Sequence, residues 1–208
     1  MDQEVIKRAV QEILLAIGED PNRAGLRETP RRVAEMLEQL LGTTALPTTD
    51  TLPGAAAPAD ATATPAATPP PVAGDMTREI VALRNIPVYS FCEHHLLPFV
   101  GHAHLAYLPQ SGRLAGFSDL TRLVDAFAHR LQLQERLTEQ VADAIMARLG
   151  PRGTLVVIEA EQLCVTMRDP KAHGTRAVTL ATRGAFARDP FLRQEAMALL
   201  GLSADTAR

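Results

Sequence analysis

The sequence predicts an α+β protein in which an antiparallel sheet is accompanied by grouped helices. Apolar runs typical of strands occur in neighbouring pairs, and helical periodicities lie between those pairs. A third observation divides the chain, because residues 43–75 are almost entirely Ala, Pro, Thr and Gly. Such a segment buries too little apolar surface to offset its ordering entropy. We therefore expect a helical hairpin at 1–42, a flexible linker at 43–75 and a folded domain at 76–208.

The N-terminal segment predicts two amphipathic helices. Apolar residues recur at helical spacing over residues 5–17, and Gly18 ends that run. The pair Thr29-Pro30 is typical of an N-cap followed by a first helical residue, and a second apolar stripe follows it. The two segments together predict a helical hairpin whose stripes serve as core or as a subunit contact.

The segment after the linker predicts four strands and three helices. Strands are expected at 79–90, 101–108, 154–160 and 177–181. Helices are expected at 118–127, with Ser118 as N-cap, at 137–149, where Gly150 ends the pattern, and at 190–200. No internal repeat is present.

The composition limits the classes of function. The chain has 208 residues and 46% hydrophobic content, enough for one sizeable core. A net charge of -3 offers no electrostatic footprint for nucleic acid or an anionic membrane. The sequence shows neither an apolar segment of the roughly 20 residues that a spanning helix needs nor the features of a signal peptide, so we expect a cytoplasmic protein.

The cysteines and one histidine-rich stretch suggest a metal site. Cys92-Glu93-His94-His95 lies between two predicted strands, and the only other cysteine, Cys164, directly follows a third. In a reducing compartment, two cysteines are more often ligands, catalysts or buried thiols than a disulfide. Zinc takes thiolate and imidazole ligands, and three protein ligands with one open position are typical of a catalytic site. For His95 alone, the alternative is a satisfied core histidine.

Several motifs together resemble the GTP cyclohydrolase I family. They are Glu28-Thr29-Pro30-Arg31-Arg32-Val33, Ser90-Phe91-Cys92-Glu93-His94-His95, Tyr107-Leu108-Pro109, Gln132-Leu133-Gln134-Glu135-Arg136-Leu137-Thr138, and Leu163-Cys164 with Met167-Arg168. They stand in the family's order and cover nearly all of the chain outside residues 43–75. The resemblance implies a tunnelling fold with helices on one side of the sheet. It also implies a homodecamer of two stacked pentameric rings with active sites at subunit boundaries.

The resemblance also implies the reaction and its residues. The family opens tetrahydrofolate and biopterin synthesis by hydrolysing C8 of the guanine ring of GTP, with release of formate and formation of 7,8-dihydroneopterin triphosphate. Zinc lowers the pKa of a coordinated water to roughly 7 and so supplies the nucleophile. The implied residues are the zinc ligands Cys92, His95 and Cys164, the purine contacts Gln134 and Glu135, the triphosphate contacts Arg122 and Arg168, and the catalytic positions His94, Ser118 and Gln162. The alternatives are a solvated first helical turn for the purine pair and ordinary surface charges for the arginines.

Four positions depart from the family pattern. Gln162 stands where the family has a histidine that donates and accepts protons, and an amide has no pKa near 7. Asp119 replaces a lysine directed at the triphosphate, although an aspartate also suits the first turn of a helix. Asp169-Pro170 replaces a glycine-led turn, and Leu180 replaces a small hydroxyl residue. We expect all four changes to surround the substrate.

Three functions are consistent with these departures. The first is an ordinary GTP cyclohydrolase I in which His173 or a water chain substitutes for the missing histidine. The second is a diverged enzyme of specialised metabolism that stops at the ring-opened formamidopyrimidine or uses a guanine compound with fewer phosphates. The third is a non-catalytic subunit that binds zinc and purine and regulates a true cyclohydrolase.

Overall fold

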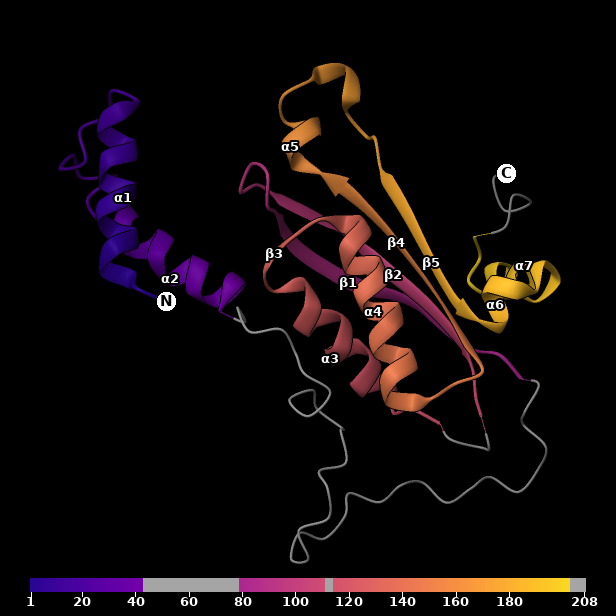
Figure 1. Cartoon of the computed structure of the whole chain (residues 1–208). Helices are drawn as coiled ribbons and strands as arrows, with labels where there is room; N and C mark the ends of the chain where they lie inside the picture. The colour runs from indigo at the N-terminus through magenta and orange to yellow at the C-terminus, as the bar shows by residue number, and fades with distance from the viewer. Residues whose placement is uncertain (43–78, 111–113, 203–208) are drawn as a thin grey trace, which may run out of the picture. The chain divides into compact units, whose positions relative to one another are not determined.

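A computed structural model describes residues 1–42, 79–110 and 114–202 of the chain. The predicted linker therefore lies outside the described residues. The chain divides into two units, Met1–Ala45 and Leu46–Arg208. The first holds two helices and the second holds the sheet (Figure 1). In the described ranges, no helix combines the length and the apolar character needed to cross a membrane.

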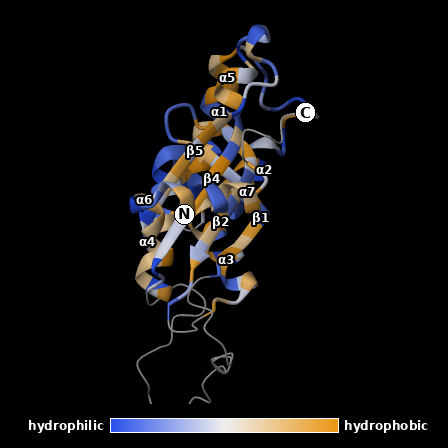
Figure 2. Ribbon diagram, turned by 90° about the vertical axis from the view of Figure 1, so that its right-hand side faces the viewer, coloured by the Kyte–Doolittle hydropathy of each residue, from blue (hydrophilic) through white to orange (hydrophobic). Residues whose placement is uncertain are grey.

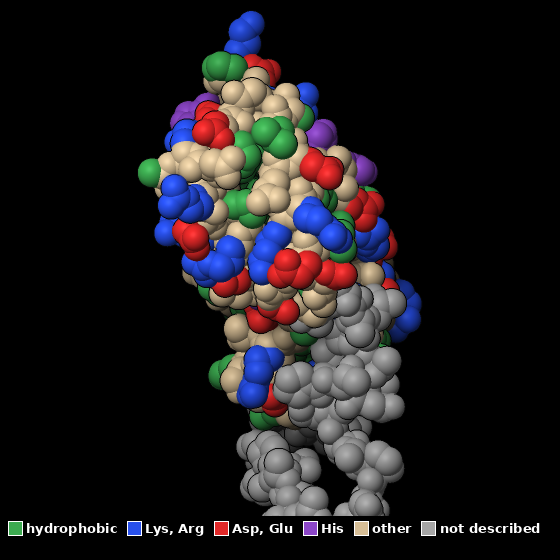
Figure 3. All heavy atoms as spheres, turned by 90° about the vertical axis from the view of Figure 1, so that its left-hand side faces the viewer, with side chains coloured by type: hydrophobic (Ala, Val, Ile, Leu, Met, Phe, Trp, Pro, Cys, Tyr) green, Lys and Arg blue, Asp and Glu red, His purple; other side chains and the backbone are tan. Residues whose placement is uncertain are grey.

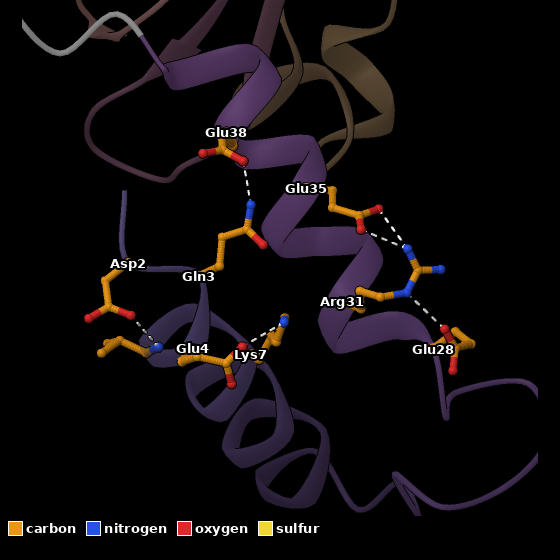
Figure 4. Close-up of polar contacts among 9 residues, drawn as sticks. Asp2, Gln3, Glu4, Lys7, Glu28, Arg31, Glu35 and Glu38 are labelled. Atoms are coloured by element: carbon orange, nitrogen blue, oxygen red, sulfur yellow. Dashed lines mark hydrogen bonds and ion pairs between the residues drawn. The ribbon is translucent and has the colours of Figure 1, made fainter.

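The first unit is the predicted helical hairpin, made of α1 (Gln3–Ala16) and α2 (Thr29–Leu41). Figure 4 shows Gln3 of α1 directed at Glu38 of α2, with which it forms a hydrogen bond. The prediction of Thr29 as N-cap is wrong by one residue. Glu28 occupies that position with helical backbone angles and forms no side-chain cap, so Thr29 already belongs to the helix.

The second unit is built on a five-stranded sheet of order β3-β1-β2-β4-β5. The strands are β1 (Val81–Cys92), β2 (Pro98–Leu108), β3 (Leu131–Gln132), β4 (Gly153–Gln162) and β5 (Ala177–Gly184). Neighbouring strands pair antiparallel except β1 and β3, which are parallel. The four predicted strands are confirmed. Three of them have longer bounds than predicted, β1 is shifted by two residues, and the two-residue β3 was not predicted.

Two helices cover one face of this sheet and form the main core. They are α3 (Phe117–Ala128) and α4 (Gln134–Leu149), and both carry hydrophobic and hydrophilic residues in Figure 2. The buried side chains Leu123, Leu137 and Ile158 belong to this core. Gly150 ends α4 in the left-handed conformation with φ of 55°, as its position in the sequence predicted.

A smaller core lies on the opposite face. Here α6 (Ala185–Arg188) and α7 (Pro190–Leu199) contribute Phe186 and Ala196, which pack with Leu155 of β4. The α+β class and the antiparallel sheet are thus confirmed, with the C-terminal helices as an addition on the second face. Acidic and basic side chains are interspersed on the face shown in Figure 3, in keeping with the net charge of -3.

A bulge in β1 determines which side chains face the main core. Leu83 lies opposite Leu105 of β2, whereas Ile86 lies opposite Ala103, so β1 contains one residue more than its partner over this stretch. Asn85, in the bulge, has a positive φ of 58°. After the bulge, the alternation places Cys92 on the face covered by α3 and α4, within the main core.

Candidate metal centre

Three predicted ligands converge at one end of the sheet. Cys92 is the last residue of β1, His95 lies in the turn that follows, and Cys164 lies in α5 (Leu163–Thr166) directly after β4. The strand register explains the meeting, because β2 pairs with β1 at Pro98 and with β4 at Phe99. The two sulfur atoms and the imidazole nitrogen all lie within 4.8 Å of one another. Within the described ranges, this is the one group of three such side chains that could hold a metal ion.

The donor set fits a zinc ion. Zn–S and Zn–N bonds of about 2.0 to 2.3 Å in a tetrahedral site place the donors roughly 3.5 to 4 Å apart, so a small contraction closes this cluster on the ion. Burial raises the pKa of the Cys164 thiol, and the neighbouring Cys92 raises it further. A divalent cation offsets both effects by stabilising the thiolates. Three ligands leave one coordination position for water or substrate.

The turn that carries His95 has a strained backbone. Cys92 N–H donates to Leu97 C=O at 2.8 Å, and Leu96 N–H donates to Cys92 C=O at 2.9 Å. Leu96 adopts a φ of 53°, the left-handed region that bulky side chains rarely occupy. The rings of His94 and His95 meet edge to face with centroids 6.2 Å apart. The turn therefore holds His94, an exposed side chain, next to the cluster.

An ion pair ties this turn to α4. The Arg136 guanidinium donates to the Glu93 carboxylate at 2.5 Å and to the side-chain oxygen of Gln132 at 2.9 Å. The hydrogen bond from Arg136 holds the pKa of Glu93 below its ordinary value. Arg136 and Gln132 lie within a motif that the sequence singled out, but periodicity gave no sign of their contacts.

Gln162 belongs to a partly buried amide network. Its side-chain nitrogen donates to the side-chain oxygen of Gln134 at 2.7 Å. The Gln134 nitrogen is directed at the carbonyls of Ile158 and Ala177 at 2.9 and 3.0 Å and at the Thr179 hydroxyl at 3.2 Å. Gln134 is only 3% exposed, so its amide is held within the fold.

A pocket of about 120 Å³ lies beside this network and α5. Its lining residues are Gln162, Val165, Thr166, Thr175, Arg176 and Ala177. Arg168 follows α5 as an exposed side chain, and its positive charge acts on the Cys164 thiol to lower the pKa. Glu135 is exposed in the first turn of α4. These positions lie on the elements that also carry the cluster or the amide network.

Ser118 and Arg122 are not brought to the cluster within one chain. They lie at the start of α3, where the Ala115 N–H donates to the Tyr107 hydroxyl near the far end of β2. Arg122 donates to the Ser118 hydroxyl at 3.2 Å and to the Asp119 carboxylate at 3.1 Å. The prediction of Ser118 as N-cap is wrong, because the helix begins at Phe117 and its N-cap is Gly116.

Leu180 lies away from the Gln162 network. The Thr179 hydroxyl points towards Gln134 and Thr138 of α4, and successive side chains of a strand point to opposite faces. Leu180 is accordingly on the other face of β5, with 51% of its surface exposed. Within a single chain, the four departures therefore do not surround one site, because Leu180 lies on the other face of β5 and Asp119 lies with Ser118 at the start of α3.

Comparison with known proteins identifies the family of the chain. A family model described as GTP cyclohydrolase I matches residues 6–201. GTP cyclohydrolase 1 of Carboxydothermus hydrogenoformans is 48% identical over 201 residues, which cover 97% of this chain and 96% of that protein. GTP cyclohydrolase 1 of Thermobifida fusca is 49% identical over 202 residues, covering 96% of this chain and 89% of that protein. A solved structure of E. coli dihydroneopterin aldolase in complex with neopterin covers 51% of this chain and 99% of its own, with 15% identity and a TM-score of 0.41.

Proposed function

The chain belongs to the GTP cyclohydrolase I family and is therefore a hydrolase, and from this premise we propose that it uses zinc to hydrolyse C8 of the guanine ring of GTP. The observation that carries the proposal is the convergence of Cys92, His95 and Cys164 at one end of the sheet. When bound there, zinc supplies the Lewis acidity that activates water for attack on the ring.

The proposed substrate contacts follow from the chemistry of the side chains. The exposed carboxylate of Glu135 can accept hydrogen bonds from the guanine N1 and the exocyclic amine together. Gln134 anchors the first turn of α4 through the hydrogen bonds of its buried amide to Ile158 and Gln162. The Arg168 guanidinium suits phosphate oxygens and lies close enough to Cys164 to influence its thiol. His94 is the exposed proton carrier next to the ligands.

We propose that a second copy of the chain completes the site. Ser118 and Arg122 lie at the end of the sheet opposite the cluster, so they reach a substrate there only from a neighbouring subunit. The strand order leaves β5 and most of β1 as sheet edges, and edge strands are suited to pairing with another copy. A homodecamer of two pentameric rings is the assembly we propose, and sedimentation or light scattering measures its size.

A second candidate function is favoured by the Gln162 contact. Its amide holds a hydrogen bond to Gln134 but has no pKa near 7, so the side chain cannot transfer a proton to or from the substrate. An enzyme with this arrangement would open the ring by adding one water at C8 and stop at the formamidopyrimidine, which keeps C8 as a formyl group, so no formate would leave. The pairing of Asp119 with Arg122 points to the related possibility of a guanine substrate with fewer phosphates.

One experiment separates these functions. The zinc-loaded protein is incubated with GTP while GTP consumption, formate release and pterin fluorescence are followed together. Formate with fluorescence supports the complete reaction, and GTP consumption without formate or fluorescence supports the stop at the formamidopyrimidine. If GTP, GDP, GMP and guanosine are all left unconsumed at saturating zinc, a non-catalytic zinc- and purine-binding subunit replaces both. The Cys164→Ala variant is the matched blank for background hydrolysis.

A further inference from the structure

We propose that Arg136 is a positioning residue that holds the metal-binding turn in its ligand-ready shape by way of Glu93. The inference rests on the proposed zinc site and adds to it a residue that touches neither metal nor substrate. Glu93 lies between the ligands Cys92 and His95 in the sequence, so a force on its side chain acts on both.

The guanidinium of Arg136 fastens three groups at once. Its Nη2 donates to the Glu93 carboxylate at 2.5 Å and to the Leu131 carbonyl at 3.2 Å, and its Nε donates to the side-chain oxygen of Gln132 at 2.9 Å. The Glu93 backbone N–H also donates to the Gln132 carbonyl at 3.1 Å. The turn is thereby attached to β3 through its backbone and to α4 through its side chain.

Gln132, which accepts a hydrogen bond from Arg136, is itself held in the buried core. Gln132 is fully buried, and its side-chain nitrogen donates to the Phe127 carbonyl and to the Gln140 side-chain oxygen, each at 2.9 Å. Phe127 lies in the last turn of α3 and Gln140 lies on α4. Arg136 therefore connects the metal turn to a junction of two helices and a strand. A lysine could replace its charge but not its fork of donors.

The turn needs this attachment because its own bonds hold it only at the two ends. Its backbone bonds involve Cys92, Leu96 and Leu97, and Leu96 is in the left-handed region. His95 is exposed, so packing does not fix its ring. Groups that orient metal ligands from behind typically change metal affinity by about 10- to 100-fold when they are removed. An exposed ion pair with no such role contributes little to stability and nothing to metal binding.

The test measures zinc affinity in the full chain by competition with a chromophoric chelator. We expect Arg136→Gln to weaken zinc binding by about 10- to 100-fold. Arg136→Lys should give a smaller loss, because it keeps the ion pair and loses the bonds to β3 and Gln132. Cobalt(II) absorption gives an independent signature, since a distorted thiolate site changes the position and strength of the ligand-field bands.

A matched control is an arginine that forms an ion pair with the same helix. Arg183 of β5 pairs with Asp143 of α4 at 2.6 Å, away from the metal turn. Arg183→Gln removes a comparable ion pair and should leave zinc affinity and the cobalt spectrum unchanged. If Arg136→Gln and Arg183→Gln have equal effects on zinc binding, Arg136 has no positioning role.

A second variant guards against misfolding. Glu93→Gln leaves the bonds of Arg136 to Gln132 and Leu131 in place and weakens only the link to the turn, and it should also lower zinc affinity. Wild-type affinity in a folded Glu93→Gln protein would overturn the inference even if Arg136→Gln could not be purified. If the wild-type protein binds no zinc, the proposed function fails first, whereas normal wild-type binding with unaffected variants contradicts the positioning role alone.

Discussion

The side-chain nitrogen of Gln162 donates a 2.7 Å hydrogen bond to the side-chain oxygen of Gln134. Gln134 in turn directs its own nitrogen at two backbone carbonyls and the Thr179 hydroxyl. The orientation of both amides is thereby determined. Gln162 keeps a second N–H and an oxygen for hydrogen bonds, but an amide has no pKa near 7 and carries no proton for catalysis. Proton transfer at this position therefore needs a different side chain.

The Gln162→His variant should increase pterin formation relative to GTP consumption. Proton transfer by a positioned side chain typically accelerates a step by about 10²- to 10⁴-fold, and an imidazole supplies it near neutral pH. The measurement is the ratio of pterin fluorescence to GTP consumed under single-turnover conditions. Gln162→Asn, a shorter amide, is the control and should give no increase. An unchanged ratio in the histidine variant would mean that ring closure is limited elsewhere.

The Asp119→Lys variant should improve binding of GTP. Asp119 lies 3.1 Å from Arg122 and neutralises a charge that would otherwise act on phosphates. Opposite unit charges at 4 Å interact by about 1 kcal/mol in water and about 4 kcal/mol at a partly buried site, so we expect KM to fall by about tenfold. The gain should shrink at high salt and be small for guanosine. Asp125→Lys, on the same helix, changes net charge equally, and a matching gain there would rule out a local effect.

Loss of either cysteine should abolish stoichiometric zinc. Cys92→Ala and Cys164→Ala each leave two ligands of a cluster that needs three. His94→Ala is the neighbouring control, because His94 lies outside the cluster and should leave the zinc content at one per chain. Metal analysis after dialysis gives the result. Full zinc retention in either cysteine variant would contradict the three-ligand site.

Replacing Gln134 should destabilise the sheet. Its nitrogen serves the carbonyls of Ile158 and Ala177, which belong to β4 and β5. Gln134→Leu leaves these carbonyl acceptors without a hydrogen-bond donor, which should lower the free energy of unfolding by about 1 to 3 kcal/mol. Urea denaturation measures the change. The exposed neighbour offers a control, since Glu135→Gln should stay within about 0.5 kcal/mol of wild type.

His104 should make the protein less stable in mild acid. The side chain is only 6% exposed, and its ring nitrogen accepts the Asn85 N–H at 3.4 Å. Burial lowers the pKa of His104, the charges of His102 and Arg84 lower it further, and Glu159 opposes them. The unfolded chain therefore binds a proton near the ordinary pKa of 6.5 while the folded chain does not. Stability is retained above that pH and falls as the pH drops towards the lower folded pKa.

Melting temperature measured across pH 5 to 8 tests this expectation, since each unit of pKa depression is equivalent to about 1.4 kcal/mol. His104→Gln should flatten the acid side of the profile. His173→Gln, at an exposed position, should leave the profile as it is. An identical acid slope in wild type and His104→Gln would assign the slope to other groups.

The sequence was a good guide to the regular elements and to the ligands. Strand and helix periodicities depend on local spacing, so the four long strands and the main helices were predictable. The three members of the cluster could be singled out because soft donors are few in this chain, with two cysteines in 208 residues. The two-residue strand at Leu131–Gln132 is too short to show any period, and it was missed.

The contacts behind the site could not be predicted. Arg136 meets Glu93 across 43 positions of sequence, and Gln162 meets Gln134 across 28. No local pattern states which polar side chains will meet at such separations. The same limit explains the C-terminal helix, because an amphipathic pattern shows that one face of α7 is buried but not which face of the sheet receives it.

Because of the bulge at Asn85, the position of the Cys92 thiol depends on the number of residues between the bulge and Cys92. Cys92 lies seven positions after Asn85, and its side chain reaches Cys164 through the alternation that follows the bulge. Removing a single residue between the bulge and Cys92 would move the thiol to the opposite face. Removing two residues would restore the face and shorten the strand. Among variants altered between the bulge and Cys92, length changes by an even number should therefore keep metal binding far more often than changes by an odd number, whereas loss of the extra bulge residue itself would leave Cys92 on the same face.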